Sequence, residues 1–271
     1  MAGPGERSSR KQGRLTAARA KKPRPEREGP SRGRVAVPSF FTLMNLLSGF
    51  LSIIQASDGN LNNAAWLIVL AAFFDLLDGL MARLAQGDSE FGVELDSLSD
   101  IVSFGVAPSF LLYQYGFYQY GAPGVVLAAL PALCGAVRLA RFNVRSDGDK
   151  KSYFEGIPIP AMAGTIVAFI LTFDDPTLFE RFSRGWFSVM VPFVVVLSGL
   201  MVSDVQFDAF PKLNPVELKR HKWTVIFFFV GVGLAIVLQE VGLFISAMGY
   251  IGYSLARAAW RFARAVMSAD A

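Results

Sequence analysis

Apolar runs of nearly membrane-spanning length follow one another along most of this chain. A helix of about 20 apolar residues crosses a hydrocarbon core of about 30 Å. Such runs lie near residues 39–56, 63–85, 92–118, 123–143, 158–174, 186–204, 223–239 and 241–257. Lipid offers no partner for backbone polar groups, so each run must satisfy them internally as a helix. The sequence therefore predicts an all-α, polytopic membrane bundle of about eight helices, in which a six-helix core is followed by two C-terminal helices.

Charge is distributed unevenly between this apolar part and the N-terminus. The first 34 residues hold 11 of the 26 Lys and Arg and 3 of the 22 Asp and Glu, so they carry +8 and the remainder −4. We expect residues 1–37 to form a disordered basic tail, 38–257 the membrane domain and 258–271 a short basic C-terminal tail. No aromatic residues interleave the charges of the N-terminal tail, which favours a solvated or lipid-contacting tail over a nucleic-acid partner.

Basic residues also predict the orientation of the chain in the membrane. The N-terminal tail and the segments 138–151 and 212–222 fall on one side of the predicted helices, as do Arg257, Arg261 and Arg264. By the positive-inside rule this side is cytoplasmic. We therefore expect a multi-pass protein of the inner or cytoplasmic membrane with both termini, and the loop near residues 86–89, at the cytoplasmic face.

Four aspartates interrupt the apolar runs, where each unpaired charge would cost several kcal/mol. Asp75 and Asp78 are i,i+3 neighbours on one predicted helix, and Asp96 and Asp100 are i,i+4 neighbours on the next, so each pair projects from one helix face. A buried ion pair or an interhelical hydrogen bond would explain one such residue. Four at these spacings favour a cage of hard oxygen ligands for Mg²⁺ or Mn²⁺, with room for two ions about 4 Å apart.

Other metal and catalytic chemistries have little support. Cys134 is the only cysteine and lies among apolar residues, so we expect it to pack, and an intrachain disulfide is excluded. His221 is the only histidine and lies in a basic stretch, which favours a loop or interfacial role over that of a general base.

The aspartates belong to a longer pattern with fixed spacing. The chain reads Asp75-x2-Asp78-Gly79-x2-Ala82-Arg83-x8-Gly92-x3-Asp96-x3-Asp100. This pattern resembles the signature of the CDP-alcohol phosphotransferases, integral membrane enzymes that move a substituted phosphoryl group from a CDP-linked donor to an alcohol. The resemblance implies Asp75, Asp78 and Asp96 as metal ligands, Asp100 at the edge of the same cluster as the general base, and a homodimer.

The resemblance also implies a set of nucleotide contacts. Gly79, Arg83 and Ser89 would contact the CDP portion of the donor, helped by Thr42 and Asn45 in the first apolar run. From the residues alone, Gly79 permits close backbone approach and Arg83 offers a planar fork to a diphosphate, while a position at the cytoplasmic flank of the span is the alternative explanation for Arg83. Thr42 and Asn45 could instead form hydrogen bonds between helices.

The acceptor alcohol must be specified outside the signature. Four further segments are informative: Ile101–Pro108, Arg138–Asn143, Phe154–Pro160 and Leu200–Ser203. They resemble the bacterial and archaeal phosphatidylserine synthases, which implies transfer of the phosphatidyl group of CDP-diacylglycerol to L-serine, with release of CMP. An acceptor carboxylate suits an Arg fork, so Arg138, Arg141 and Asn143 are candidate serine contacts. Glycerol 3-phosphate or inositol as acceptor, or an ion-coupled transporter, remain alternatives.

Overall fold

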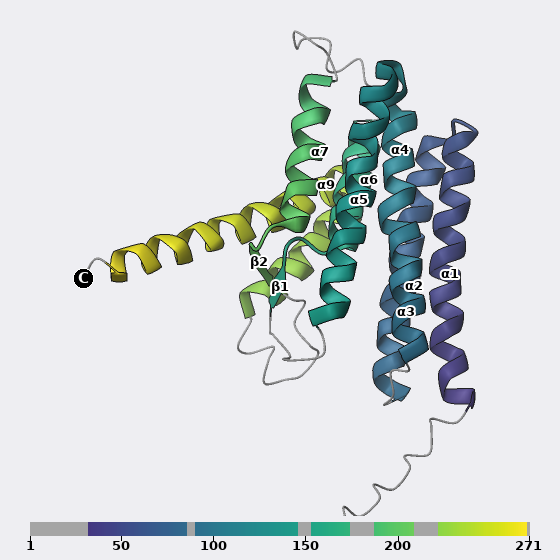
Figure 1. Ribbon diagram of the computed structural model, residues 1–271, viewed down its shortest axis with the longest axis horizontal. Helices are drawn as coiled ribbons and strands as arrows, with labels where there is room; N and C mark the ends of the chain where they lie inside the picture. Colours follow the sequence, from purple (N-terminus) through teal and green to yellow (C-terminus); the bar gives the residue numbers. More distant parts are fainter. Residues whose placement is uncertain (1–31, 86–89, 146–152, 174–186, 209–221, 270–271) are drawn as a thin grey trace, which may run out of the picture. The chain divides into compact units, whose positions relative to one another are not determined.

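The computed structural model describes residues 32–85, 90–145, 153–173, 187–208 and 222–269 (Figure 1). Helices make up nearly all of this part of the chain. In order, its elements are α1 (Arg32–Ser57), α2 (Leu61–Ala85), α3 (Glu90–Asp100), the π-helix η1 (Ile101–Val106), α4 (Ala107–Tyr115), the 3-10 helix η2 (Phe117–Tyr120), α5 (Gly121–Arg145), β1 (Tyr153–Glu155), α6 (Ile159–Thr172), α7 (Phe187–Val202), β2 (Gln206–Asp208) and α9 (Lys222–Ala269).

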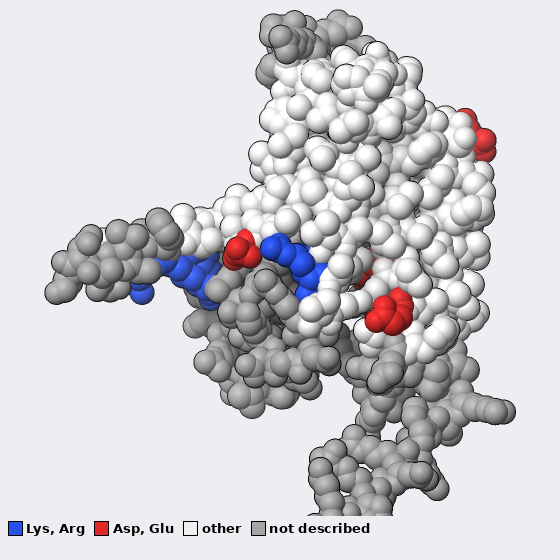
Figure 2. Space-filling model, in the orientation of Figure 1, with Lys and Arg blue, Asp and Glu red and all other residues white. Residues whose placement is uncertain are grey.

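The structure confirms the predicted fold class, a helical membrane protein. Four helical stretches among the described residues are long and apolar enough to cross a bilayer, and two shorter apolar helices are α6 and α7. The four are Phe40–Ser57, Leu61–Ala82, Phe91–Tyr115 and Phe117–Val144. On the face drawn in Figure 2 most described side chains are uncharged, as lipid-facing surfaces require. The chain is a multi-pass membrane protein.

The two predicted C-terminal spans form a single helical element with a break. Within α9, Gln239 adopts φ 51° and ψ −121°, a conformation rarely open to a residue with a side chain. The hydroxyl of Thr172, at the end of α6, donates a 3.0 Å hydrogen bond to the carbonyl of Glu240. The break therefore lies where the sequence separates the two apolar runs, and α6 contributes to holding it.

Both ends of the membrane domain are more helical than the sequence predicts. Helix α1 already begins at Arg32, before the expected end of the tail near residue 37, and α9 continues to Ala269 through the expected C-terminal tail. Extending an established helix adds a hydrogen bond per residue without new nucleation, which explains both extensions. The predicted disorder of residues 1–31 lies outside the described residues.

A π-helical turn follows Asp100 directly and was not predicted. The amide of Ala107 donates to the carbonyl of Val102, five residues back, and Pro108 stands in the first turn of α4. Proline cannot donate to the carbonyl four residues before it and would clash with it in a regular helix. The wider turn of η1 accommodates Pro108 and turns Ser103, Phe104 and Gly105 into the buried interior.

Two three-residue strands are the exception to an all-helical fold, and the sequence prediction did not include them. β1 and β2 pair antiparallel, with Phe154 opposite Phe207. Next to them Gly156 has φ 76°, and its amide donates a 2.8 Å hydrogen bond to the carbonyl of Val205. A Cβ there would meet the carbonyl of Met201 at the end of α7, so this position requires glycine. The strands thus tie the α5–α6 connection to the segment after α7.

Small residues allow α1 to pack closely against its neighbours. Ser52 of α1 donates a 2.8 Å hydrogen bond to the carbonyl of Ala64 in α2, and Ala56, Ala64 and Ala65 are fully buried. Gly49 lies against η1, because a Cβ built on it would come within 2.7 Å of Ser103 Cα. Close approach through small residues is typical of helices packed within membranes. It places α1 beside both aspartate-bearing helices.

Candidate functional site

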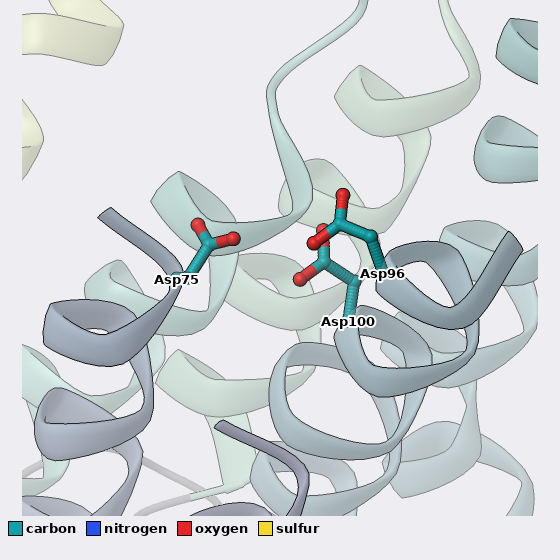
Figure 3. Close-up of side chains that lie close together, drawn as sticks. All are labelled: Asp75, Asp96 and Asp100. Atoms are coloured by element: carbon teal, nitrogen blue, oxygen red, sulfur yellow. The ribbon is translucent and has the colours of Figure 1, made fainter. Parts of the chain in front are cut away.

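Three of the four predicted aspartates converge from two helices. Asp75 of α2 faces Asp96 and Asp100 of α3 (Figure 3), and one carboxylate oxygen from each lies within 4.8 Å of the others. The i,i+4 spacing places Asp96 and Asp100 on one face of α3, as predicted. Asp100 is only 9% exposed. Three like charges held this close repel one another strongly, so the arrangement favours a bound cation.

This donor set suits a divalent metal. Mg²⁺ and Mn²⁺ prefer carboxylate oxygens, and Mg²⁺ holds them at about 2.0–2.1 Å, so two ligands on opposite sides of one ion are about 4.2 Å apart. The 4.8 Å limit within the cluster is slightly larger. Small side-chain rotations would therefore close the cluster around one ion.

Asp78 belongs to the same region but not to this group of three. Its side chain is 7% exposed, and Oδ2 accepts a hydrogen bond from the hydroxyl of Thr42 in α1. Asp78 still acts electrostatically on Asp75, one helical turn earlier on α2. The structure thus places Asp78 beside the cluster, with one of its oxygens engaged by α1.

Helix α1 also contacts the last aspartate. Asn45 is fully buried, and its Nδ2 donates a 3.3 Å hydrogen bond to Oδ1 of Asp100. The two polar residues predicted in the first apolar run, Thr42 and Asn45, therefore both make interhelical hydrogen bonds to aspartates. This is one of the two interpretations that the sequence allowed for them.

Two serines that were not predicted as site residues donate hydrogen bonds back to the backbone of α1. Ser99 Oγ donates to the carbonyl of Thr42 at 3.0 Å, and Ser103 Oγ donates to the carbonyl of Asn45 at 2.9 Å. Both serines are completely buried. Their only sequence signal was the spacing Ser99-x3-Ser103 interleaved with Asp96 and Asp100, which places them on the neighbouring face of the same helix.

The three residues predicted to contact the acceptor substrate occupy different environments. Arg138 of α5 is 9% exposed, and its charge acts on Asp100. The exposed side chain of Arg141 donates from Nη1 to the carbonyl of Val202 at 2.8 Å, which satisfies the C-terminal end of α7. Asn143 donates to Ser97 Oγ at 3.1 Å. Of the three, the buried cation Arg138 is the one that acts on the aspartate cluster.

The predicted nucleotide contacts are described only in part. Gly79 is half-buried on α2, directly after Asp78. Arg83 lies in the last turns of α2, but its side chain lies outside the described part of the structure, as does Ser89 altogether.

The fold and the acidic cluster define a polytopic membrane protein with a carboxylate site able to hold a divalent metal. The family model of the CDP-alcohol phosphatidyltransferases matches residues 35–205, and the chain belongs to this family. It is therefore a transferase. The match ends before β2 and α9.

Three relatives illustrate the similarity. The chain is 36% identical over 230 residues to the CDP-diacylglycerol–serine O-phosphatidyltransferase of Helicobacter pylori strain 26695, covering 83% of this chain and 91% of that protein. It is 39% identical over 175 residues to the archaetidylserine synthase of Methanothermobacter thermautotrophicus, covering 64% and 70%. It is 33% identical over 187 residues to the CDP-diacylglycerol–serine O-phosphatidyltransferase of Bacillus subtilis, covering 69% and 98%.

Proposed function

We propose that this enzyme transfers the phosphatidyl group of CDP-diacylglycerol to the hydroxyl of L-serine, giving phosphatidylserine and CMP. The proposal rests above all on the convergence of Asp75, Asp96 and Asp100 beside a buried arginine, Arg138. The names of the similar proteins from H. pylori and B. subtilis support the donor and the acceptor.

The aspartates provide the metal site of this reaction. Asp75, Asp96 and Asp100, with Asp78 at the edge, would hold one or two Mg²⁺ or Mn²⁺ ions, which when bound neutralise the diphosphate and stabilise the attacking and departing oxygens. Thr42 orients Asp78 through its hydroxyl. These carboxylates come from α2 and α3, and both helices pack against α1, which fixes their position relative to one another.

Asp100 is the proposed general base. It accepts the proton of the serine hydroxyl while that oxygen forms a bond to the phosphorus nearer the lipid. The bond from this phosphorus to the bridging oxygen breaks, and its electron pair leaves with CMP. Asn45 orients the base through Oδ1 of its carboxylate, so that one oxygen is fixed while the carboxylate acts on the acceptor.

Asn45 also has a group that suits the donor substrate. Its Oδ1 is buried and has no hydrogen-bond partner among the described residues. A buried acceptor without a partner costs about 1–3 kcal/mol, which a donor group on the nucleotide would recover. We assign Gly79, Arg83, Ser89 and Thr42 to the same CDP-diacylglycerol site on the basis of the family resemblance.

Arg138 is the proposed receptor for the serine carboxylate. A guanidinium can form two parallel hydrogen bonds to a carboxylate, and its action on Asp100 means that it would hold the acceptor near the base. We assign Arg141 and Asn143 to the same serine-binding site. Their hydrogen bonds to Val202 and Ser97 also hold the end of α5 in place.

The basic segments of the sequence support a cytoplasmic membrane location with the site and both termini at the cytoplasmic face. That face gives access to a CDP-linked donor. By the family resemblance, the enzyme works as a homodimer.

The experiment that tests the proposal is CMP release by purified protein with CDP-diacylglycerol and Mg²⁺ or Mn²⁺, in the presence of L-serine, glycerol 3-phosphate, inositol or no acceptor. We expect release that depends on L-serine. Release that depends on another acceptor would overturn the substrate assignment but keep the metal site. Absence of release from folded protein with every acceptor would contradict the proposed reaction.

A further inference from the structure

The C-terminal end of α9 is much less buried than the part that precedes it. After the break at Gln239 the helix packs against α6, where the ring centroids of Phe244 and Phe169 are 5.8 Å apart. Ser254 is the last buried side chain among those that the structure describes, and every described side chain after it is exposed or half-buried. Residues 255–269, here called the terminal segment, are therefore helical but largely outside the packed core.

The terminal segment has one basic face. Its only charged residues are Arg257, Arg261 and Arg264. Spacings of four and three residues place all three on the same side of a helix, and Figure 2 shows Lys and Arg side chains along one edge of this end of α9. Leu255 and Ala259 fall on the opposite side, where both are exposed. The terminal segment is thus an amphipathic helix with positive charge on one side and apolar side chains on the other.

An aromatic side chain lies at the border between these two sides. Trp260 is 59% exposed, and the guanidinium carbon of Arg264 lies 5.1 Å from the centroid of its ring. Tryptophan is enriched at the headgroup level of bilayers, where its amphipathic ring contacts both apolar and polar groups. Arginines are costly within the hydrocarbon core itself. The combination is typical of a helix that lies at the boundary between membrane and water.

Anionic phospholipid headgroups match the basic face. An arginine fork can form two parallel hydrogen bonds to phosphate oxygens, and the surface of a bilayer presents many such oxygens in one plane. Arg257 and Arg261 also take part in interactions within the chain, but the five N–H donors of an arginine allow more than one contact. A soluble partner on the basic face would leave Leu255 in water, whereas a bilayer accommodates both sides of the helix.

We propose that the terminal segment lies in the membrane–water boundary and binds the headgroups of anionic phospholipids through Arg257, Arg261 and Arg264. This interaction lies outside the family match, which ends at residue 205. It requires neither the metal site nor an acceptor, so it goes beyond the proposed function.

The test places a fluorescent label on the terminal segment of the full-length protein. Cys134 is the only cysteine, so Cys134→Ala combined with Met267→Cys leaves a single thiol for a bimane label. The protein is reconstituted in nanodiscs of phosphatidylcholine alone or mixed with an equal amount of phosphatidylglycerol, each containing a trace of phosphatidylcholine with a nitroxide on its headgroup. The nitroxide quenches bimane on close approach. We expect strong quenching with phosphatidylglycerol and weak quenching with phosphatidylcholine alone.

The arginines should account for this difference. Each of Arg257→Gln, Arg261→Gln and Arg264→Gln should shift the equilibrium towards the released segment by roughly fivefold, the factor that corresponds to one basic residue near an anionic surface. The three substitutions together should reduce quenching to the level seen in phosphatidylcholine. Lysine at the same three positions is the matched control, because it keeps the charge, and we expect it to retain the quenching. The thermal midpoint should stay near the wild-type value in both triple variants.

Three results would overturn the proposal. Equal quenching in the two lipid compositions would show that apolar insertion alone holds the segment. Undiminished quenching after all three arginines are changed to glutamine would exclude them as the binding groups. Weak quenching in both compositions would place the segment away from the headgroups, and crosslinking through Met267→Cys would then identify a second copy of the chain as its partner. None of these results depends on CMP release, so failure here is distinct from failure of the proposed function.

Discussion

Asn45 donates a 3.3 Å hydrogen bond to the carboxylate of Asp100, and this bond joins the first apolar helix to the last aspartate of the cluster. It is reinforced by the return bond from Ser103 to the carbonyl of Asn45. Helix α1 carries no member of the acidic cluster, yet its Asn45 orients the carboxylate of Asp100. Residues outside the family signature therefore contribute to the geometry of the site.

Asn45→Ala tests the role of this bond. Removing the amide leaves the buried carboxylate without its donor on α1, so we expect kcat to fall about 10- to 100-fold, the range seen when a group that orients a metal ligand is removed. Protein stability should fall by about 1–3 kcal/mol. The measurement is serine-dependent CMP release together with thermal unfolding in detergent.

Ser48→Ala is the control for that variant. Ser48 is also buried on α1, but its hydroxyl donates to the carbonyl of Met44 in the same helix at 2.8 Å. We expect nearly wild-type turnover from it. Comparable losses in the two variants would show that α1 supports the fold alone and does not orient Asp100.

Asp75→Asn tests the acidic cluster directly. The substitution keeps the size of the side chain and removes one of three converging charges, so metal binding should weaken and turnover fall roughly 100-fold or more. The metal concentration that gives half-maximal activity should rise as well. Both are read from CMP release across a titration with Mn²⁺.

Glu94→Gln is the matched control, because Glu94 is an exposed acidic residue on α3 close to Asp96. It also loses one negative charge, and we expect its metal titration to coincide with that of the wild-type protein. The assignment of Asp75 as a ligand would be wrong if Asp75→Asn retained the wild-type metal titration.

Removing and replacing the metal provides a test without mutation. Treatment with EDTA should abolish turnover, and Mg²⁺ or Mn²⁺ should restore it. Ca²⁺ should restore it poorly, because it prefers six to eight ligands at about 2.3–2.6 Å, a larger shell than three converging carboxylates supply. CMP release after each addition is the measurement, and full activity in EDTA would contradict a metal-dependent reaction.

The sequence could predict the helical class and the acidic cluster because both depend on local periodicity. Apolar runs of membrane-spanning length specify helices whatever their partners, and the i,i+4 spacing of Asp96 and Asp100 places both on one face of any helix. The approach of Asp75 to that face followed from the assumption that neighbouring helices pack, and the structure shows this approach.

Features that depend on contacts between distant segments could not be predicted in this way. The bond from Thr42 to Asp78 joins residues 36 positions apart, and the pairing of Phe154 with Phe207 joins two connections. The π-helix had a local cause in Pro108, but a proline also fits a kink or a helix start. For Arg138, the sequence could not distinguish a flanking charge from a buried side chain near Asp100.

Gly49→Ala tests whether close packing of α1 on η1 supports the site. A Cβ at this position would lie 2.7 Å from Cα and 2.9 Å from Cβ of Ser103, so backbone atoms must move apart. Such overpacking costs about 1–3 kcal/mol. Because η1 directly follows Asp100, we also expect turnover to fall.

Gly164→Ala on α6 is the control, since nothing lies within 4 Å of a Cβ there, and alanine should keep or slightly raise helix stability. The thermal midpoint in detergent and CMP release are measured for both variants, and equal midpoints would show that α1 and η1 can separate without cost.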